Sequence, residues 1–130
     1  MKYLLDTNQI IDFLNNKQSV VELLSVKAAE GLAISTISVA EYLQGVFRSK
    51  NPKHALYLFS KFIEEGKVEI LVVDFQIAET YAKLQAQFEQ KGNRIPLFDL
   101  LIAASAITHQ LTLISDDKVF TRIKDLQLLN

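Results

Sequence analysis

Short apolar runs alternate along the chain with longer segments in which apolar residues recur at helical spacing. The short runs are rich in Leu, Ile and Val and predict buried strands at residues 2–5, 32–35, 68–73 and 112–115. The longer segments predict helices at residues 7–15, 19–30, 52–66 and 75–91. Strands that alternate with helices favour an α/β sandwich, with a mainly parallel sheet and helices on both of its faces.

Punctuating residues and apolar content refine these elements. Gly31, Gly66 and Gly92 end three of the predicted helices, as glycine often does. We expect a further helix to open at Ser38, with an inward stripe of Val39, Leu43, Val46 and Phe47. The helix beginning at Leu97 or Phe98 is apolar nearly all round, which predicts a central position. A short helical turn at 119–123 and an edge strand at 126–129 bring the prediction to four or five strands.

Length and composition limit the class of protein. With 130 residues, 49% hydrophobic and 22% charged, the chain suits one globular domain spanning 1–130. The absence of cysteine excludes disulfides and thiolate metal sites and fits a reducing cytoplasm. The most apolar stretch, residues 100–107, is far shorter than the roughly 20 residues that span a bilayer, so we expect no membrane association. A net charge of −1 argues against binding nucleic acid through bulk charge.

Acidic residues follow apolar stretches in separate parts of the chain. They are Asp6, Glu41, Asp99 and the pair Asp116 and Asp117. Carboxylates are usually solvated, and the carboxyl ends of parallel strands form the ligand-binding edge of an α/β sheet. Asp6 and the Asp116–Asp117 pair follow predicted strands, while Glu41 and Asp99 lie in the first turns of predicted helices that start at the same edge. The topology therefore predicts that these acids meet.

Clustered carboxylates repel one another, by roughly 1 to 4 kcal/mol for a pair about 4 Å apart. A divalent cation removes this penalty, and the hard ions Mg²⁺ and Mn²⁺ prefer oxygen ligands. Such a site can activate water for attack on a phosphodiester and stabilise the leaving oxygen. The acid pattern therefore predicts a Mg²⁺ or Mn²⁺ site.

Ordinary helix capping explains each acid taken singly. Asp6 precedes Thr7 as an N-cap residue does, and Ser38 with Glu41 matches a capping box. Asp99 in a first helical turn is favoured by the helix dipole, and the Asp116–Asp117 pair fits a turn. Capping does not, however, require all of these residues to converge. Asn8 and Ser115 are expected to hold carboxylates by hydrogen bonds, with simple capping as the alternative.

At these residues the chain resembles the PIN-domain ribonucleases, and within them the VapC-like toxins of type II toxin–antitoxin modules. The resemblance spans essentially the full length. It rests on the stretches Leu5–Asp12, Ser38–Tyr42, Asp99–Ala104 and Leu113–Phe120. The order and spacing of these stretches make the joint match specific.

The resemblance implies a PIN-like three-layer sandwich and a Mg²⁺- or Mn²⁺-dependent endoribonuclease that cuts structured RNA such as tRNA or rRNA. Asp6, Glu41 and Asp99 match the metal-binding acids of the family. The fourth acid of the family follows a Thr or Ser by two residues and precedes a Phe by three. Here Ser115 and Phe120 select Asp117, and Asp116 is an additional acid that leaves this assignment open.

The resemblance also implies partners. They are a homodimer mate and an antitoxin whose C-terminal segment inserts near the acids, giving a toxin–antitoxin hetero-oligomer. The apolar helices at 19–30 and 52–66 are candidates for the groove that receives this segment. Several basic residues are candidates for phosphate contact with RNA, with ordinary solvated helix faces as the alternative: Arg48, Lys50, Lys53, Lys91, Arg94, Lys118 and Arg122.

Two other functional classes are consistent with parts of the pattern. A catalytically weak module with this fold could act only through protein or RNA partners, although the complete set of acids argues against it. A phosphate-accepting signalling domain also clusters acids around Mg²⁺. It is disfavoured because no adjacent acid pair ends the first predicted strand.

Overall fold

The computed structural model describes residues 1–130 and is built on a five-stranded, entirely parallel sheet. The strand order across the sheet is β3-β2-β1-β4-β5. The strands are β1 (Tyr3–Leu5), β2 (Leu32–Ser35), β3 (Glu69–Leu71), β4 (Thr112–Ile114) and β5 (Gln127–Leu129). This confirms the predicted α/β class and places β1 at the centre, where the chain reverses its direction of travel across the sheet between β1 and β4.

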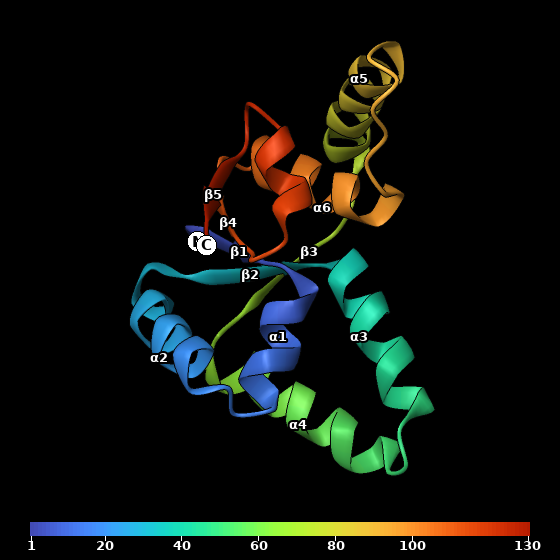
Figure 1. Cartoon of the computed structure of the whole chain (residues 1–130). Coiled ribbons are helices and arrows are strands. Elements are labelled where there is room, and N and C mark those ends of the chain that lie inside the picture. Colours follow the sequence, from blue (N-terminus) through green and yellow to red (C-terminus); the bar gives the residue numbers. More distant parts are fainter.

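Helices cover both faces of the sheet (Figure 1). One face carries α1 (Thr7–Leu14), α2 (Gln18–Lys27), α3 (Thr36–Arg48) and α4 (Pro52–Glu65). The other carries α5 (Phe75–Gln90), α6 (Leu97–Thr108) and the 3₁₀ helix η2 (Lys118–Arg122), while a second 3₁₀ turn, η1 (Ala28–Glu30), follows α2. The side chains of β1 alternate between the two apolar cores, with Tyr3 and Leu5 on the first face and Leu4 on the second.

Helix α6 is the central helix, as its apolar composition predicts. Residues Ile102 to Ala106 are all buried within it, and Leu100 is fully buried one turn earlier. This burial fixes the body of α6 against the sheet, and Asp99 lies in the first turn of the helix.

The predicted start of α3 is wrong by two residues. The helix begins at Thr36 and is capped by Ser35, whose Oγ accepts a hydrogen bond of 3.0 Å from the Ile37 N–H. Ser38 is therefore inside the helix and fully buried, so the capping-box explanation of Glu41 fails. Glu41 lies in the second turn of the helix rather than the first.

One apolar side chain predicted to point inward is exposed. Phe47 on α3 is 67% exposed, whereas Val46 beside it is buried. A helix packed on one side buries a single stripe, and Val46 lies in that stripe. Strand β3 is also shorter than the predicted run 68–73, as is usual for an edge strand.

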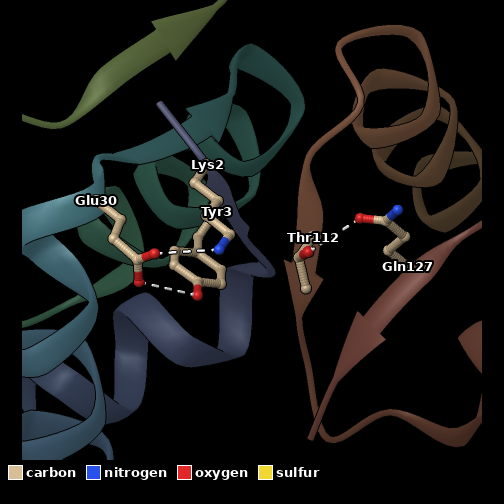
Figure 2. Close-up of polar contacts among 5 residues, drawn as sticks. All are labelled: Lys2, Tyr3, Glu30, Thr112 and Gln127. Carbon is tan, nitrogen blue, oxygen red and sulfur yellow. Dashed lines mark hydrogen bonds and ion pairs between the residues drawn. The ribbon is translucent and has the colours of Figure 1, made fainter.

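Polar contacts fasten the amino ends of the strands, at the edge opposite the acids (Figure 2). The Tyr3 hydroxyl and the Lys2 ammonium each donate to Glu30, both at 3.1 Å, and tie the start of β1 to the end of η1. The Thr112 hydroxyl donates to Oε1 of Gln127 at 3.2 Å, between the first residues of β4 and β5. No helix combines the length and apolar character needed to cross a bilayer.

Candidate metal and catalytic site

The carboxyl ends of β1 and β4 form the centre of the candidate site. The Asp6 N–H donates to the carbonyl of Ile114 at 3.0 Å, which extends the pairing of the two strands by one residue. The Asp6 carboxylate is buried and accepts hydrogen bonds from the Ser115 hydroxyl at 2.7 Å and from the Thr7 N–H at 2.8 Å. Asp6 thus caps α1, as the simpler explanation required, and also lies at the point where ligands bind in open α/β sheets.

Glu41 reaches this edge from α3 through a contact that sequence reasoning did not identify. The Thr7 hydroxyl donates to Oε1 of Glu41 at 2.6 Å. Thr7 is the first residue of α1 and is buried, so the bond fixes Glu41 beside the residue that follows Asp6. The position of Thr7 directly after Asp6 indicates that its hydroxyl lies near the acids. The choice of Glu41 as its hydrogen-bond partner depends on how α3 packs against α1.

Asp99 lies in the first turn of α6 and is partly buried. Burial, with smaller contributions from the negative charges of Asp6, Asp117 and Glu41, raises the pKa of its carboxyl to about 6. Charges that shift the pKa of a carboxyl lie near it, so Asp6, Asp117 and Glu41 all lie close to Asp99. The structure therefore brings these four acids to the same edge of the sheet.

The pKa of Asp6 is shifted by the same kinds of interaction. Burial raises its pKa, the hydrogen bonds from Ser115 and Thr7 lower it, and the charges of Glu41 and Asp117 raise it. The net direction is upward, so the two hydrogen bonds do not fully offset burial and repulsion.

Asp116 and Asp117 occupy different environments. Asp117 caps η2 by accepting from the Val119 N–H at 3.0 Å, and its charge acts on both Asp6 and Asp99. Asp116 accepts a long hydrogen bond of 3.4 Å from the buried amide of Gln9. The hydrogen bond between Gln9 and Asp116 is a second contact that the sequence does not predict, because the two residues lie 107 positions apart in the chain.

Other predicted residues are distributed less tightly. Ser115 donates to Asp6 and accepts from the Asp117 N–H at 3.0 Å, so it joins two of the acids, whereas Asn8 is exposed. All seven candidate RNA-contacting residues are exposed. Lys91 and Arg94 lie in the segment before α6, Lys118 directly follows Asp117, and Arg122 ends η2. Arg48 ends α3, Lys50 lies just beyond it, and Lys53 lies in the first turn of α4.

The donor atoms fit a hard divalent cation. They are carboxylate and hydroxyl oxygens, with no histidine or cysteine among them. No group of three acidic side chains lies close enough together in this structure to hold one ion directly. Mg²⁺ is commonly held by one or two carboxylates and retains several waters. The buried Ser38 hydroxyl, one helical turn before Glu41, has no hydrogen-bond partner within the protein.

Comparison with known proteins identifies the family. The PIN domain family model matches residues 3–126. The chain is 35% identical over 133 residues to the protein named ribonuclease VapC2 of Rickettsia felis, covering 100% of this chain and 98% of the relative. It is 27% identical over 130 residues to the protein named tRNA(fMet)-specific endonuclease VapC of Salmonella typhimurium, covering 98% and 96% of the two chains.

A solved structure agrees in fold over the whole chain. The crystal structure of VapBC2 from Rickettsia felis bound to a DNA fragment from its promoter superposes with a TM-score of 0.91 at 32% identity, covering 100% of this chain and 98% of the other. A full-length match of this quality extends to the sheet, the helices and the edge that carries the acids. The chain therefore belongs to the PIN-domain family and is a relative of the VapC ribonucleases.

Proposed function

We propose that this protein is a divalent-metal-dependent endoribonuclease and the toxin of a type II toxin–antitoxin pair. The observation that carries the proposal is the convergence of Asp6, Glu41, Asp99 and Asp117, which reach one sheet edge from four separate segments. Hydrogen bonds through Ser115 and Thr7 link three of these segments. Relatives that match along the full chain are named ribonucleases, and one is named a tRNA-specific endonuclease.

The acids have distinct roles in this proposal. Asp6, Asp99 and Asp117 hold the Mg²⁺ or Mn²⁺ ion. Glu41, whose position is fixed by the Thr7 hydroxyl, is assigned to share a proton with the attacking water. When bound, the ion supplies charge stabilisation for the phosphate and lowers the pKa of water. Ser115 and Thr7 orient Asp6 and Glu41 through the hydrogen bonds described above. Asp116 is assigned a secondary role because Gln9 already engages it.

The substrate in this proposal is a structured RNA such as a tRNA or rRNA. Its phosphates would contact Lys91, Arg94 and Lys118 around the acids and, with less support, Arg48 and Lys50 along α3. Binding through such contacts weakens steeply as salt concentration rises. An RNA affinity that stays flat between low and physiological salt contradicts this assignment of the basic residues.

The antitoxin in this proposal binds the face of the molecule formed by α1, α2, α3 and α4. A groove of 260 Å³ lies between α1, α3 and α4, lined in part by Ile11, Tyr42 and Gly45, and it leads to Glu41. A smaller hollow of 150 Å³ lies between α1, α2 and α4, lined in part by Phe13 and Phe62. A basic antitoxin side chain in the first groove would neutralise Glu41 in place of the metal. We place this complex, and a toxin homodimer within it, in the cytoplasm, where tRNA and rRNA are found.

Cleavage of RNA by the purified protein tests the function. The protein alone is incubated with end-labelled total tRNA in Mg²⁺, in Mn²⁺ and in EDTA, beside the variant Asp6→Asn. We expect discrete fragments with either ion and none in EDTA, and a loss of at least about 100-fold in the variant. Cleavage in EDTA, or equal cleavage by Asp6→Asn, contradicts the proposal. The control variant Asp12→Asn changes a carboxylate that instead pairs with Lys17 at 3.8 Å.

A further inference from the structure

Arg122 ties together the two segments that carry Asp99 and Asp117. It is the last residue of η2, the 3₁₀ helix that Asp117 caps. Its Nη2 donates to the carbonyl oxygens of Asn93 and Arg94, both at 3.0 Å, and to the side-chain Oδ1 of Asn93. One guanidinium nitrogen therefore faces three oxygens of the loop that leads into α6.

Few side-chain contacts hold this loop. Helix α6 begins after Pro96, which provides no side-chain cap for the helix. The Asn93 N–H donates to a carbonyl of α5 at 3.0 Å, and Ile95 is buried in the apolar core that also contains Phe120 of η2. Arg122 adds the side-chain hydrogen bonds between the loop and η2.

We propose that Arg122 is a positioning residue that fixes the distance between Asp99 and Asp117, and does not contact RNA. The inference rests on the metal site proposed above, since the spacing of these acids matters only if they share an ion. The engagement of Nη2 by three oxygens argues against the alternative, in which the side chain extends to an RNA phosphate, as proposed above for other exposed basic residues.

The test compares Arg122→Gln with the matched variant Lys124→Gln. Lys124 is exposed, lies two residues away and carries the same charge. For Arg122→Gln we expect Mn²⁺ affinity, measured by calorimetry, to fall on the order of tenfold, kcat for RNA cleavage to fall with KM unchanged, and RNA affinity in EDTA to stay at the wild-type value. Lys124→Gln should match the wild type in all three measurements. A rise in KM alone, with normal Mn²⁺ affinity, assigns Arg122 to RNA and overturns the proposal.

Two further variants separate positioning from a general loss of structure. Asn93→Ala removes one of the three acceptors, so it should give a smaller fall in Mn²⁺ affinity, and its combination with Arg122→Gln should add little to the single change. Arg122→Lys keeps the charge and supplies one nitrogen with three N–H donors, so we expect at least partial recovery of Mn²⁺ affinity relative to Arg122→Gln. No recovery with lysine, or additive effects in the double variant, contradicts the proposal.

Amide hydrogen exchange tests the positioning role of Arg122 separately from metal binding. If the wild-type protein binds no Mn²⁺, the metal site is refuted, yet the tie between η2 and the loop can still be measured. Amides of residues 97–100 should exchange faster in Arg122→Gln than in Lys124→Gln, because the first turn of α6 is less firmly anchored. Equal exchange in the two variants refutes the positioning role whether or not the metal binds.

Discussion

The Ser115 hydroxyl donates a hydrogen bond of 2.7 Å to Oδ2 of Asp6, and the bond joins the ends of β4 and β1. Both side chains are buried, so the carboxylate has little access to water as a substitute donor. Ser115 also accepts from the Asp117 N–H, which makes it the junction between a central acid and an outer one. The order of the site therefore depends on a residue that is not itself an acid.

Replacing Ser115 by alanine should weaken both stability and metal binding. A hydrogen bond to a buried charged group contributes about 1.5 to 3 kcal/mol, and its loss leaves Asp6 without its strongest side-chain donor. We expect the free energy of unfolding to fall within this range in urea denaturation. Mn²⁺ affinity should fall by roughly 10- to 100-fold. Ser115→Thr, which keeps the hydroxyl, serves as the control, and an alanine variant as stable as the wild type would show that water replaces the donor.

Thr7→Val should impair the site while leaving the fold intact. Valine matches the shape of threonine but cannot donate the hydrogen bond of 2.6 Å to Glu41. We expect RNA cleavage to fall on the order of tenfold, as for other residues that orient a functional carboxylate. The melting temperature should change little, because Glu41 is partly exposed and water can solvate it. If Glu41→Gln retains full activity, Thr7 has no catalytic group to orient and this prediction fails with it.

Replacing Asp116 and Asp117 by asparagine should have different effects on metal binding. Asp117 acts electrostatically on Asp6 and Asp99, whereas Asp116 accepts from Gln9. We expect Asp117→Asn to lower Mn²⁺ affinity by roughly 10- to 100-fold, and Asp116→Asn to change it by less than about threefold. Calorimetry on the two variants decides the question, and the opposite ranking assigns the fourth position to Asp116.

Stability of the metal-free protein should depend on pH through Asp99. The folded state keeps a proton on this group up to about pH 6, whereas the ordinary carboxyl value is 3.8. Between these values the native state binds more protons than the unfolded chain, so the free energy of unfolding falls as the pH rises. In EDTA, Asp99→Asn should therefore melt above the wild type at pH 7, and this advantage should shrink towards pH 4.

Melting temperatures measured with Mg²⁺ provide a comparison for the metal-free pH series. Adding Mg²⁺ at pH 7 should raise the melting temperature of the wild type and leave that of Asp99→Asn nearly unchanged, because only the former has the complete set of acids. A melting difference between the two proteins that is constant from pH 4 to pH 7 would rule out Asp99 as the group responsible.

Gly45 lines the groove between α1, α3 and α4. It lies inside α3 one turn beyond Glu41, and a Cβ added there meets no atom within 4 Å. Gly45→Ala should therefore stabilise the protein by about 0.5 to 1 kcal/mol, since glycine is unfavourable in a helix interior. Gly45→Leu would fill the groove and should weaken antitoxin binding by roughly tenfold. Unchanged antitoxin affinity in the leucine variant places the antitoxin on another surface.

The parallel sheet and the edge on which most of the acids lie were predictable from sequence for a simple reason. Apolar runs of strand length are clear in this chain, and the carboxyl ends of parallel strands coincide, so Asp6 and Asp99 could be placed from the sequence. The order of the strands across the sheet was not predicted. The start of α3 was less certain because Ser35 and Ser38 both resemble cap residues. Only the backbone decides between them, and the choice moves Glu41 by most of a turn.

Contacts that depend on packing could not be predicted. Thr7 meets Glu41 only because α1 and α3 lie side by side, and Gln9 meets Asp116 only through the pairing of β1 with β4. The clamp of Arg122 on Asn93 likewise joins residues 29 apart across two loops. Helix patterns also failed to show which of two adjacent apolar residues faces inward, as the exposure of Phe47 beside the buried Val46 demonstrates.

Binding of Mn²⁺ to the wild-type protein and to a set of single acid variants tests the central claim most directly. Calorimetry at neutral pH should show binding to the wild type that weakens by at least about tenfold in Asp6→Asn, Asp99→Asn and Asp117→Asn, and that is unchanged in Asp12→Asn. Glu41→Gln should retain more affinity than the first three, given its proposed part in proton transfer. Wild-type protein that binds no Mn²⁺, or binds it equally after each of these changes, would contradict a shared metal site at this edge of the sheet.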